Sequence, residues 1–192
     1  MTNKTSRTLR GLGLGLALLS GCGPEVQEGA GPETPEATGT VGQGVTFNNG
    51  SFESAPTITS GCSGGITGST AFPGWTLAGS VTLYAPACRT PAQGTRSIAI
   101  NSGNISQTFA TVVGGGYTVT FAHAKASSCS TNAYIDISYQ GTTYNFFSNT
   151  TAWATRTVVF NATSTSTTLT FKNTYTSGAC ASALDNVTVT GP

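Results

Sequence analysis

Residues 104–124, with the sequence NISQTFATVVGGGYTVTFAHA, decide the fold of this chain. Large apolar residues alternate with small polar ones on both sides of Gly114, Gly115 and Gly116. A period of two places one set of side chains on a core and the other in solvent, which is the pattern of a half-buried β-strand. The glycines supply the turn between two such strands. Because a pair of strands is not stable alone, the rest of the chain must build a sheet around it.

Short apolar runs of the same kind recur from residue 46 onward, and no stretch shows the period of a helix. Further strands are expected at residues 47–52, at 72–77 (a turn leading into a strand), and at 80–84, 97–100, 134–139, 144–147, 156–160, 167–171 and 183–190. A long Ser/Thr/Gly loop is expected over residues 54–70. About ten short strands predict an all-β domain, a β-sandwich of the jelly-roll type, whose first and last strands meet.

The composition restricts the function. Charged residues make up only 8% of the chain, and the formal net charge is +1. Such a surface has no charge field that would attract nucleic acid. Thr, Ser, Gly and Asn are abundant, which is typical of sandwiches and leaves few titratable groups for catalysis.

The first 21 residues have the organisation of an export signal. Basic residues precede an apolar run at residues 12–19, which is too short to span a bilayer, and small residues follow it. Residues 19–22, LSGC, resemble the lipobox of bacterial lipoproteins. The resemblance implies cleavage before Cys22 and lipidation of this cysteine, whose acyl chains would anchor the protein to a membrane. The alternative is an ordinary signal peptide with an incidental cysteine.

Residues 22–45 are rich in Pro, Gly and Glu and contain few large apolar side chains. This segment is expected to be a flexible tether between the anchor and a folded domain at residues 46–192. Gly23, rather than an aspartate, follows the cysteine. By resemblance to lipoprotein sorting in enterobacteria, this implies an outer-membrane location, with the domain exposed at the cell surface.

Four cysteines remain for the folded domain: Cys62, Cys88, Cys129 and Cys180. An even number of cysteines in an exported domain argues for disulfides. Three pairings are possible, and we expect Cys62–Cys88, in loops that bracket the strands near residues 75–84, and Cys129–Cys180, in polar loops before later strands. A zinc site is the competing interpretation, and it is weak because the sequence has no C-x-x-C spacing and a single histidine, His123.

Six short motifs stand in a characteristic order: NGSFE at 49–53, PGWT at 73–76, GSV at 79–81, GTRSI at 94–98, ISQT at 105–108 and LDNVTV at 184–189. In order and spacing they resemble the galactose-binding-like jelly rolls of the domain-of-unknown-function 642 family, over residues 46–190. That family occurs in plant cell walls and on bacterial surfaces. The layout is more distantly similar to carbohydrate-binding modules that open with an N-G-x-F-E strand. The resemblance implies a jelly roll associated with polysaccharide and no enzymatic activity.

The resemblance also points to Glu53 and Asp185, from the opening and the closing strand. In the related sugar-binding modules, the matching Glu and Asp help to hold a structural calcium ion together with backbone carbonyls, so it implies a calcium site here, although no cofactor is required. Asp185 has the same parity as Val187 and is expected to point inward, where a carboxylate needs a partner or a metal. The alternative is that backbone N–H groups or Arg96 cap the carboxylates.

No catalytic arrangement is visible. Asp136 alternates with Ile135 and Ile137 and is expected in solvent, so a glycosidase pair of carboxylates in one cleft is not supported. His123 continues the apolar face of its strand and is expected to be a packed side chain rather than a base, and the sequence has no G-x-S-x-G elbow. We therefore expect no enzymatic activity.

Sugar sites combine flat aromatic faces with amides and a few charges. The candidate ligand-binding residues are Trp153, Tyr144, Tyr84 and Arg89, with Tyr134, Tyr175 and Arg96 as further candidates. Trp153 lies among threonines in a polar loop, whereas Trp75 follows a Pro-Gly turn and is expected in the core. We expect a non-catalytic, lipid-anchored surface protein that binds a polysaccharide or a matrix glycan. The alternative is a structural or protein-binding surface module without a sugar ligand.

Overall fold

The computed structural model describes residues 44–127, 129–174 and 180–192. The chain divides into one unit at Met1–Thr40 and another at Val41–Pro192, and all described residues belong to the second. The expected signal peptide, the lipidation site Cys22, most of the tether and Tyr175 lie outside the described residues. Within the described ranges, no helix is long and apolar enough to cross a membrane.

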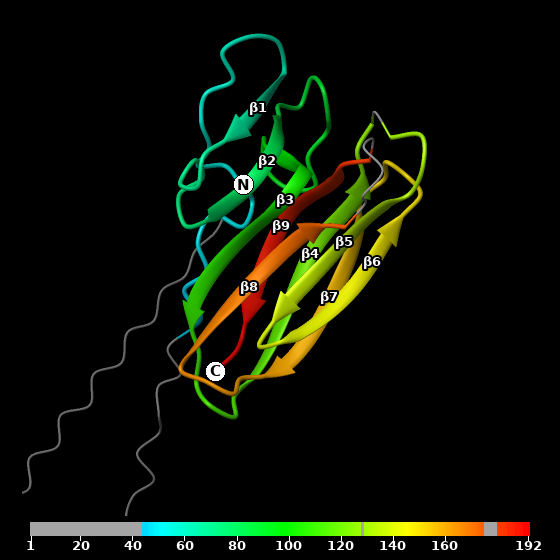
Figure 1. Ribbon diagram of the computed structural model, residues 1–192. Coiled ribbons are helices and arrows are strands. Elements are labelled where there is room, and N and C mark those ends of the chain that lie inside the picture. The colour runs from blue at the N-terminus through cyan, green and yellow to red at the C-terminus, as the bar shows by residue number, and fades with distance from the viewer. Residues whose placement is uncertain (1–43, 128, 175–179) are drawn as a thin grey trace, which may run out of the picture. The chain divides into compact units, whose positions relative to one another are not determined.

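Nine strands and no helix make up the described part of the second unit (Figure 1). The strands are β1 (Ser63–Thr67), β2 (Thr76–Tyr84), β3 (Ser97–Ala110), β4 (Gly116–Lys125), β5 (Ala133–Tyr139), β6 (Thr142–Ser148), β7 (Ala154–Asn161), β8 (Ser166–Asn173) and β9 (Ser182–Thr190). The all-β class is confirmed, with nine strands in the described residues where about ten were expected.

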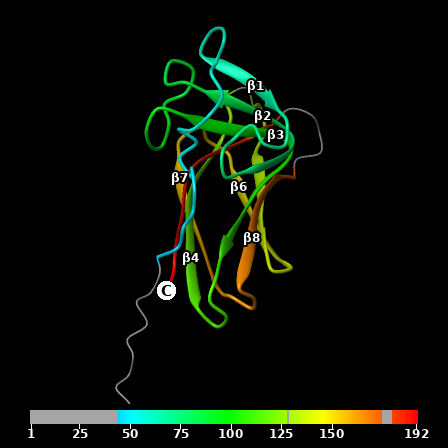
Figure 2. The same cartoon turned by 90° about the vertical axis from the view of Figure 1, so that its left-hand side faces the viewer.

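The strands form one curled sheet with the order β6-β5-β8-β3-β9-β4-β7, and β2 and β1 continue from β3. The sheet becomes a sandwich because β3 takes part in both layers. Residues 104–110 pair with β8, whereas residues 98–100 pair with β9. Figure 2 shows the layers from the side, with β4 and β7 in one and β8 in the other.

The core lies between these layers, where aromatic rings from opposite sides meet. The ring centres of Phe121 in β4 and Phe171 in β8 are 5.1 Å apart, and those of Tyr139 in β5 and Phe160 in β7 are 4.5 Å apart. Trp75 is 3% exposed within this core, as expected. Ring pairs of this kind contribute about 0.5–1.5 kcal/mol each beyond the area that they bury. They therefore help to fix how one layer faces the other.

The strands β2 and β3 bend from one layer to the other at two facing glycines. Gly79 and Gly103 are partners in the register, and their φ angles are 116° and 75°. A Cβ on either glycine would collide with a backbone carbonyl of the opposite strand. A register shift follows between Ser80 and Val81. The expected strands at 72–77 and 80–84 are therefore parts of one bent strand, and the same holds for those at 97–100 and 104–110.

The two strands of residues 104–124 are present as β3 and β4, with glycines in the connection as expected. However, β3 pairs with β2, β8 and β9, whereas β4 pairs with β7 and β9. The connection carries the chain between layers, and Phe109 and Tyr117 face each other across the core with ring centres 6.2 Å apart. Two strands joined through glycines are confirmed, but they are not hydrogen-bonded neighbours, because alternation specifies which face is buried and not which strand is the neighbour.

Residues 47–52 do not form the expected strand. The side-chain amide of Gln107, in β3, takes the place of a neighbouring backbone. Its Oε1 accepts from the N–H of Asn48 at 2.7 Å, and its Nε2 donates to the carbonyl of Asn48 at 2.8 Å. After a turn at Gly50, the N–H of Val187 in β9 donates to the Gly50 carbonyl at 2.9 Å. The opening segment thus meets the last strand as expected, but without a strand ladder.

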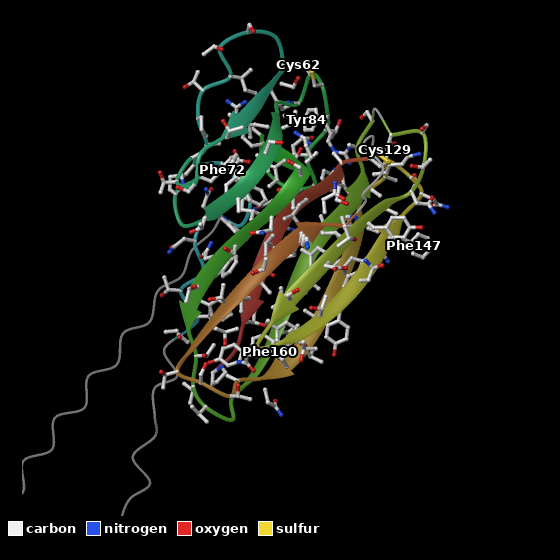
Figure 3. The ribbon with its side chains drawn as sticks, in the orientation of Figure 1. Cys62, Phe72, Tyr84, Cys129, Phe147 and Phe160 are labelled. Atoms are coloured by element: carbon white, nitrogen blue, oxygen red, sulfur yellow. A yellow bond between two sulfur atoms is a disulfide. The ribbon has the colours of Figure 1, made fainter. Side chains whose placement is uncertain are left out.

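Two disulfides confirm the expected pairing of the cysteines. Cys62–Cys88 joins the residue before β1 to the loop after β2, and Cys129–Cys180 joins the β4–β5 loop to the segment before β9 (Figure 3). The Cα atoms are 5.4 and 4.7 Å apart. The strand β1 beside the first disulfide was expected to be part of a loop over residues 54–70, and it pairs with β2. Each disulfide is expected to stabilise the fold by about 2–4 kcal/mol.

Candidate functional site

Asp185 is a fully buried carboxylate that holds the loop between β2 and β3. Its Oδ2 accepts hydrogen bonds from the backbone N–H groups of Ala92, at 2.7 Å, and Gln93, at 3.0 Å. Its Oδ1 accepts from the N–H of Asn186 at 2.7 Å. Burial raises the pKa of Asp185 to about 6, while the backbone hydrogen bonds act to lower it.

The direction of this side chain differs from the expectation. Asn186 has a positive φ of 48°, and the pairing of β9 with β4 shifts register next to it. Leu184 and Val187 both belong to the core between the layers. Asp185, which follows Leu184 in the strand, therefore points to the opposite face, where residues 92–93 cover it. The inward direction was predicted for a regular strand, and the bulge at Asn186 reverses it.

Glu53 supports the same loop from its exposed side. Its Oε1 accepts from the N–H groups of Thr95, at 2.8 Å, and Arg96, at 2.9 Å, and its Oε2 accepts from the Thr95 hydroxyl at 2.6 Å. Although partial burial opposes ionisation, the hydrogen bonds from Thr95 and Arg96 leave the pKa of Glu53 below its ordinary value. Both carboxylates are therefore capped by N–H and O–H donors, which was the alternative to calcium binding.

A calcium ion fits this arrangement poorly. Each of the four oxygens of Glu53 and Asp185 already accepts a hydrogen bond. Among the described residues there is no group of three or more His, Cys, Asp or Glu side chains that could hold a metal ion. Calcium binding through Glu53 and Asp185 therefore stays a prediction.

Three of the four predicted ligand-binding residues, Tyr84, Arg89 and Trp153, lie near a patch of alanine side chains on the outer face of the sheet. Ala99, Ala183 and Ala124 are neighbours across β3, β9 and β4, on the face opposite Leu184. Tyr84 and Trp153 pack against the buried cluster that contains these alanines. The guanidinium carbon of Arg89 is 4.2 Å from the centre of the Trp153 ring. The structure therefore brings Tyr84, Arg89 and Trp153 to one place.

Internal hydrogen bonds already use both Nη atoms of Arg89 and the indole N–H of Trp153. Arg89 is 7% exposed, and it donates from Nη1 to the Lys125 carbonyl at 3.2 Å and from Nη2 to the Thr151 carbonyl at 3.1 Å. Trp153 donates from Nε1 to the Thr90 carbonyl at 2.9 Å. These contacts support the loops that precede β3 and β7. An open pocket of about 360 Å³ remains beside them, lined by Cys88, Arg89, Thr90, Ser127, Thr151, Ala152 and Trp153.

The fourth predicted residue, Tyr144, lies elsewhere, on the edge strand β6. Its side chain is 45% exposed, and its ring stacks on that of Tyr139 with centres 6.1 Å apart and planes at 19°. Burial, together with Tyr144, raises the pKa of Tyr139 to about 12. Because Tyr139 packs in the core, Tyr144 extends the core toward solvent on the side of the sandwich between β6 and β7.

A second pocket opens on the same side, further along β6, with a volume of about 410 Å³. It is lined by Asn145, Phe146, Phe147, Ser148, Asn149, Thr150, Ala154 and Arg156. Phe147 is 54% exposed at this edge (Figure 3). Phe146 packs partly against the core, with its ring centre 5.5 Å from that of Phe121. The pocket therefore combines aromatic surface with amides, hydroxyls and one guanidinium.

Sequence reasoning missed the residues of this pocket, although one signal was available. Phe146 and Phe147 are adjacent in a strand, so their side chains must point to opposite faces and one of them must leave the core. Arg156 lies beside Phe146 and Phe147 because β7 approaches β6. The alternation pattern cannot predict which strands come close. Arg156 donates from Nη2 to the carbonyl of Phe147 at 2.8 Å, and its guanidinium carbon is 5.7 Å from the Phe146 ring centre.

Within the described part of the chain, no acid–base pair lines these pockets. A third pocket, of about 490 Å³, is lined by Gly116, Tyr117, Thr118, Val159, Phe160 and Asn161, and a carboxylate lines none of the three. Asp136 lies on the outer face of β5, where it accepts from Asn145 Nδ2 at 2.7 Å. His123 is fully buried, as expected, and burial, followed by Arg156 and Arg89, lowers its pKa to about 4.

The model of a family described as protein of unknown function DUF642 matches residues 45–190 of this chain. No curated protein sequence matches the chain. Several solved structures are similar at low sequence identity. One described as CBM4 structure and function is 15% identical and covers 77% of this chain and 100% of its own, with a TM-score of 0.46. TmCBM61 in complex with β-1,4-galactotriose is 16% identical and covers 61% of this chain and 88% of its own, with a TM-score of 0.44. The CBM22-1 xylan-binding domain of Xyn10C from Paenibacillus barcinonensis is 14% identical and covers 65% and 88%, with a TM-score of 0.45.

Proposed function

The chain belongs to the DUF642 family over residues 45–190, and we propose that its folded domain binds carbohydrate without catalysing a reaction. The ligand class is a polysaccharide or a matrix glycan. The domain acts at the surface of a bacterial cell, anchored in the outer membrane through lipid on Cys22 and separated from the membrane by the tether over residues 22–45.

The observation that carries the proposal is the pocket of about 410 Å³ between the edges of β6 and β7. A sugar ring has an apolar face of C–H groups and a rim of hydroxyls. Phe147 offers an exposed aromatic face for the first, and Asn145 and Asn149 offer amides for the second. The volume lies in the range of about 300–1,000 Å³ that is common for small-ligand sites.

The lining of the pocket also supports a binding role rather than catalysis. A glycosidase places two carboxylates on either side of the bond that it cleaves. The carboxylates of Glu53 and Asp185 instead accept hydrogen bonds from the loop over residues 92–96, and Asp136 accepts from Asn145 without lining the pocket.

A glycan array with the full-length protein in detergent tests the proposal. We expect binding to at least one polysaccharide class, weakened roughly tenfold by Phe147→Ala. Val113→Ala is the matched control, because Val113 is 60% exposed in the β3–β4 connection, at the end of the sandwich away from residues 148–154. Binding measured with Tyr144→Ala and with Trp153→Ala shows whether these two other aromatic side chains contribute to glycan binding. Failure to bind pectic, cellulosic and bacterial glycans, with the domain folded, would contradict the proposal.

The anchor has its own test. Metabolic labelling with a fatty acid should label the wild-type protein and not Cys22→Ser, and protease added to intact cells should remove the domain if it faces outward. Labelling of the Cys22→Ser variant, or its retention in the membrane fraction, would contradict lipidation at this residue.

A protein ligand is the second candidate, and one observation favours it. Among the described strands, β6 pairs only with β5 and β7 only with β4, so each offers a free backbone edge. Val159 of β7 is 64% exposed beside it. Such an edge can accept a strand from another chain. Binding of cell-envelope proteins that survives glycosidase treatment would favour this candidate over the sugar ligand.

A further inference from the structure

We propose that the ligand of the β6–β7 pocket carries a carboxylate, so that the domain recognises an acidic, uronate-containing polysaccharide through Arg156. This inference rests on the proposed function and names the chemical class of its ligand.

Arg156 is held in place at the pocket wall. Its Nη2 donates to the Phe147 carbonyl at 2.8 Å, and its guanidinium carbon lies 5.7 Å from the ring centre of Phe146. The opposite nitrogen, Nη1, has no hydrogen bond within the described part of the chain, and it is not among the enclosed polar atoms. A fixed guanidinium with a free N–H group facing a pocket loses little side-chain entropy when it binds an acceptor.

The positive charge of Arg156 has no counter-charge beside it among the residues that the structure describes. In the described ranges, no carboxylate forms an ion pair with it. Glu53 and Asp185 accept hydrogen bonds from the loop over residues 92–96, and Asp136 accepts from Asn145 on the outer face of β5. Burial is the main cause that lowers the pKa of His123, and the positive charges of Arg156 and Arg89 lower it further.

The other walls of the pocket specify what kind of anion fits. Phe146 and Phe147 provide apolar surface, whereas Asn145, Asn149 and Thr150 provide amides and a hydroxyl. A small inorganic anion would leave the aromatic surface unused. A sugar acid satisfies both parts, because its ring presents C–H groups and hydroxyls and its planar carboxylate matches the planar fork of a guanidinium.

The experiment compares each acid with its own methyl ester, which keeps the ring and the hydroxyls and removes the charge. Titration calorimetry uses the full-length protein in detergent, with a chelator present, and tetrasaccharides of galacturonate, glucuronate and mannuronate as probes. We expect at least one acid to bind about 10- to 100-fold more tightly than its ester. Arg156→Gln should remove this preference and leave binding of the ester unchanged, and Arg156→Lys should keep part of it.

Lys172→Gln is the charge-matched control, because Lys172 is exposed on β8 and does not line the pocket. It should leave the preference for the acid intact. If Arg156→Gln does not fold, as judged by circular dichroism, the ratio of acid to ester affinity is compared between the wild type and Arg156→Lys instead. A ratio that is lower in Arg156→Lys supports the inference, and an equal ratio contradicts it.

Equal binding of acid and ester overturns the inference and leaves the proposed function standing. Binding to neutral or sulfated glycans alone also overturns the inference and leaves the proposed function standing. An acid preference that Arg156→Gln and Lys172→Gln reduce equally also overturns it, since general charge would then be the cause. Failure of every glycan, neutral or acidic, overturns the proposed function as well.

Discussion

Asp185 is a buried charge whose role in the domain is structural. It is fully buried, and its two oxygens accept three backbone N–H groups from residues 92, 93 and 186. Hydrogen bonds to an ionised acceptor are stronger than neutral ones, and they offset part of the cost of burying the charge. The side chain thereby fixes residues 92 and 93 on the outer face of β9.

Replacement of Asp185 by Ala should destabilise the domain by about 2–4 kcal/mol, because backbone N–H groups would lose their acceptor in a buried place. Urea unfolding followed by fluorescence measures this loss. Asp136→Ala is the matched control, since Asp136 is a carboxylate on the outer face of β5, and we expect a change within about 0.5 kcal/mol. Equal effects of the two substitutions would contradict the role assigned to Asp185.

His123 should lower the stability of the fold at acidic pH. It is fully buried, and neither ring nitrogen has a hydrogen-bond partner among the described residues. Burial, followed by Arg156 and Arg89, lowers its pKa from 6.5 to about 4. Below pH 6.5 the unfolded chain binds a proton that the folded chain takes up only near pH 4, so the free energy of unfolding decreases across this interval.

Titration of Asp185 changes the free energy of unfolding with pH in the opposite direction to His123. The test must therefore separate the two groups. Its pKa is raised from 3.8 to about 6, so its contribution is full below pH 3.8 and is lost as the pH rises through 6. Comparing His123→Leu with the wild type cancels this trend, because both keep Asp185. Between pH 6.5 and 4 the free energy of unfolding should shift in favour of the variant by up to about 3 kcal/mol. A difference that does not change with pH would contradict the prediction.

The bent strands β2 and β3 join the two layers, and their bend depends on glycine. At Gly103 the φ angle is 75°, and a Cβ would collide with the carbonyl of Ala78. Gly114, in the β3–β4 connection, has a similar φ of 80° but open space around it. Substitutions at Gly114 and Gly103 therefore separate two costs in the free energy of unfolding: the strain of a left-handed backbone, and the clash of a side chain with a neighbouring strand.

Gly114→Ala should cost about 1–2 kcal/mol, which is the strain of a side chain in the left-handed region. Gly103→Ala should cost at least about 2 kcal/mol more, because the strands would have to move apart at the bend. Denaturant midpoints of the two variants test this order. Similar midpoints would show that the bend tolerates a side chain, and that the facing glycines do not determine the geometry of the two layers.

The sandwich as a unit is closed on one side and open on the other. On the closed side β3 runs through both layers, with β2 paired to its residues 97–106. On the open side the edge strands β6 and β7 are not paired with each other, and side chains such as Phe146 and Arg156 fill the space between them. The proposed pocket lies on this open side, where backbone pairing does not close the sheet.

Removal of calcium should leave the stability of the whole domain unchanged. The carboxylates expected to bind the ion already accept N–H and O–H groups. We expect a chelator to change Tm by less than about 2 °C, since a ligand stabilises a fold only in proportion to its occupancy of a native site. A rise in Tm with millimolar calcium that is lost in Glu53→Gln would instead support the metal site that the resemblance implies.

The amino-acid sequence by itself determined the all-β class and the burial of Trp75 and His123. It left three possible pairings of the four cysteines in the folded domain, and the structure shows the expected one. The class and the burial depend on local information, since alternation and turn residues act over a few neighbouring residues. The disulfides, by contrast, join cysteines that are 26 and 51 residues apart in the chain. The order of the six motifs also predicted membership of the DUF642 family, whose model matches residues 45–190.

Only the tertiary structure decided which strands are neighbours, where Asp185 points and where a pocket forms. β3 and β4 follow each other in the chain and yet lie in different layers. The bulge at Asn186 reverses the side of the strand on which Asp185 lies. Arg156 meets Phe146 and Phe147 because β7 approaches β6 across the open side. The physical reason is the same in each case: strand register and layer packing depend on contacts between residues far apart in the chain, which period-two alternation does not specify.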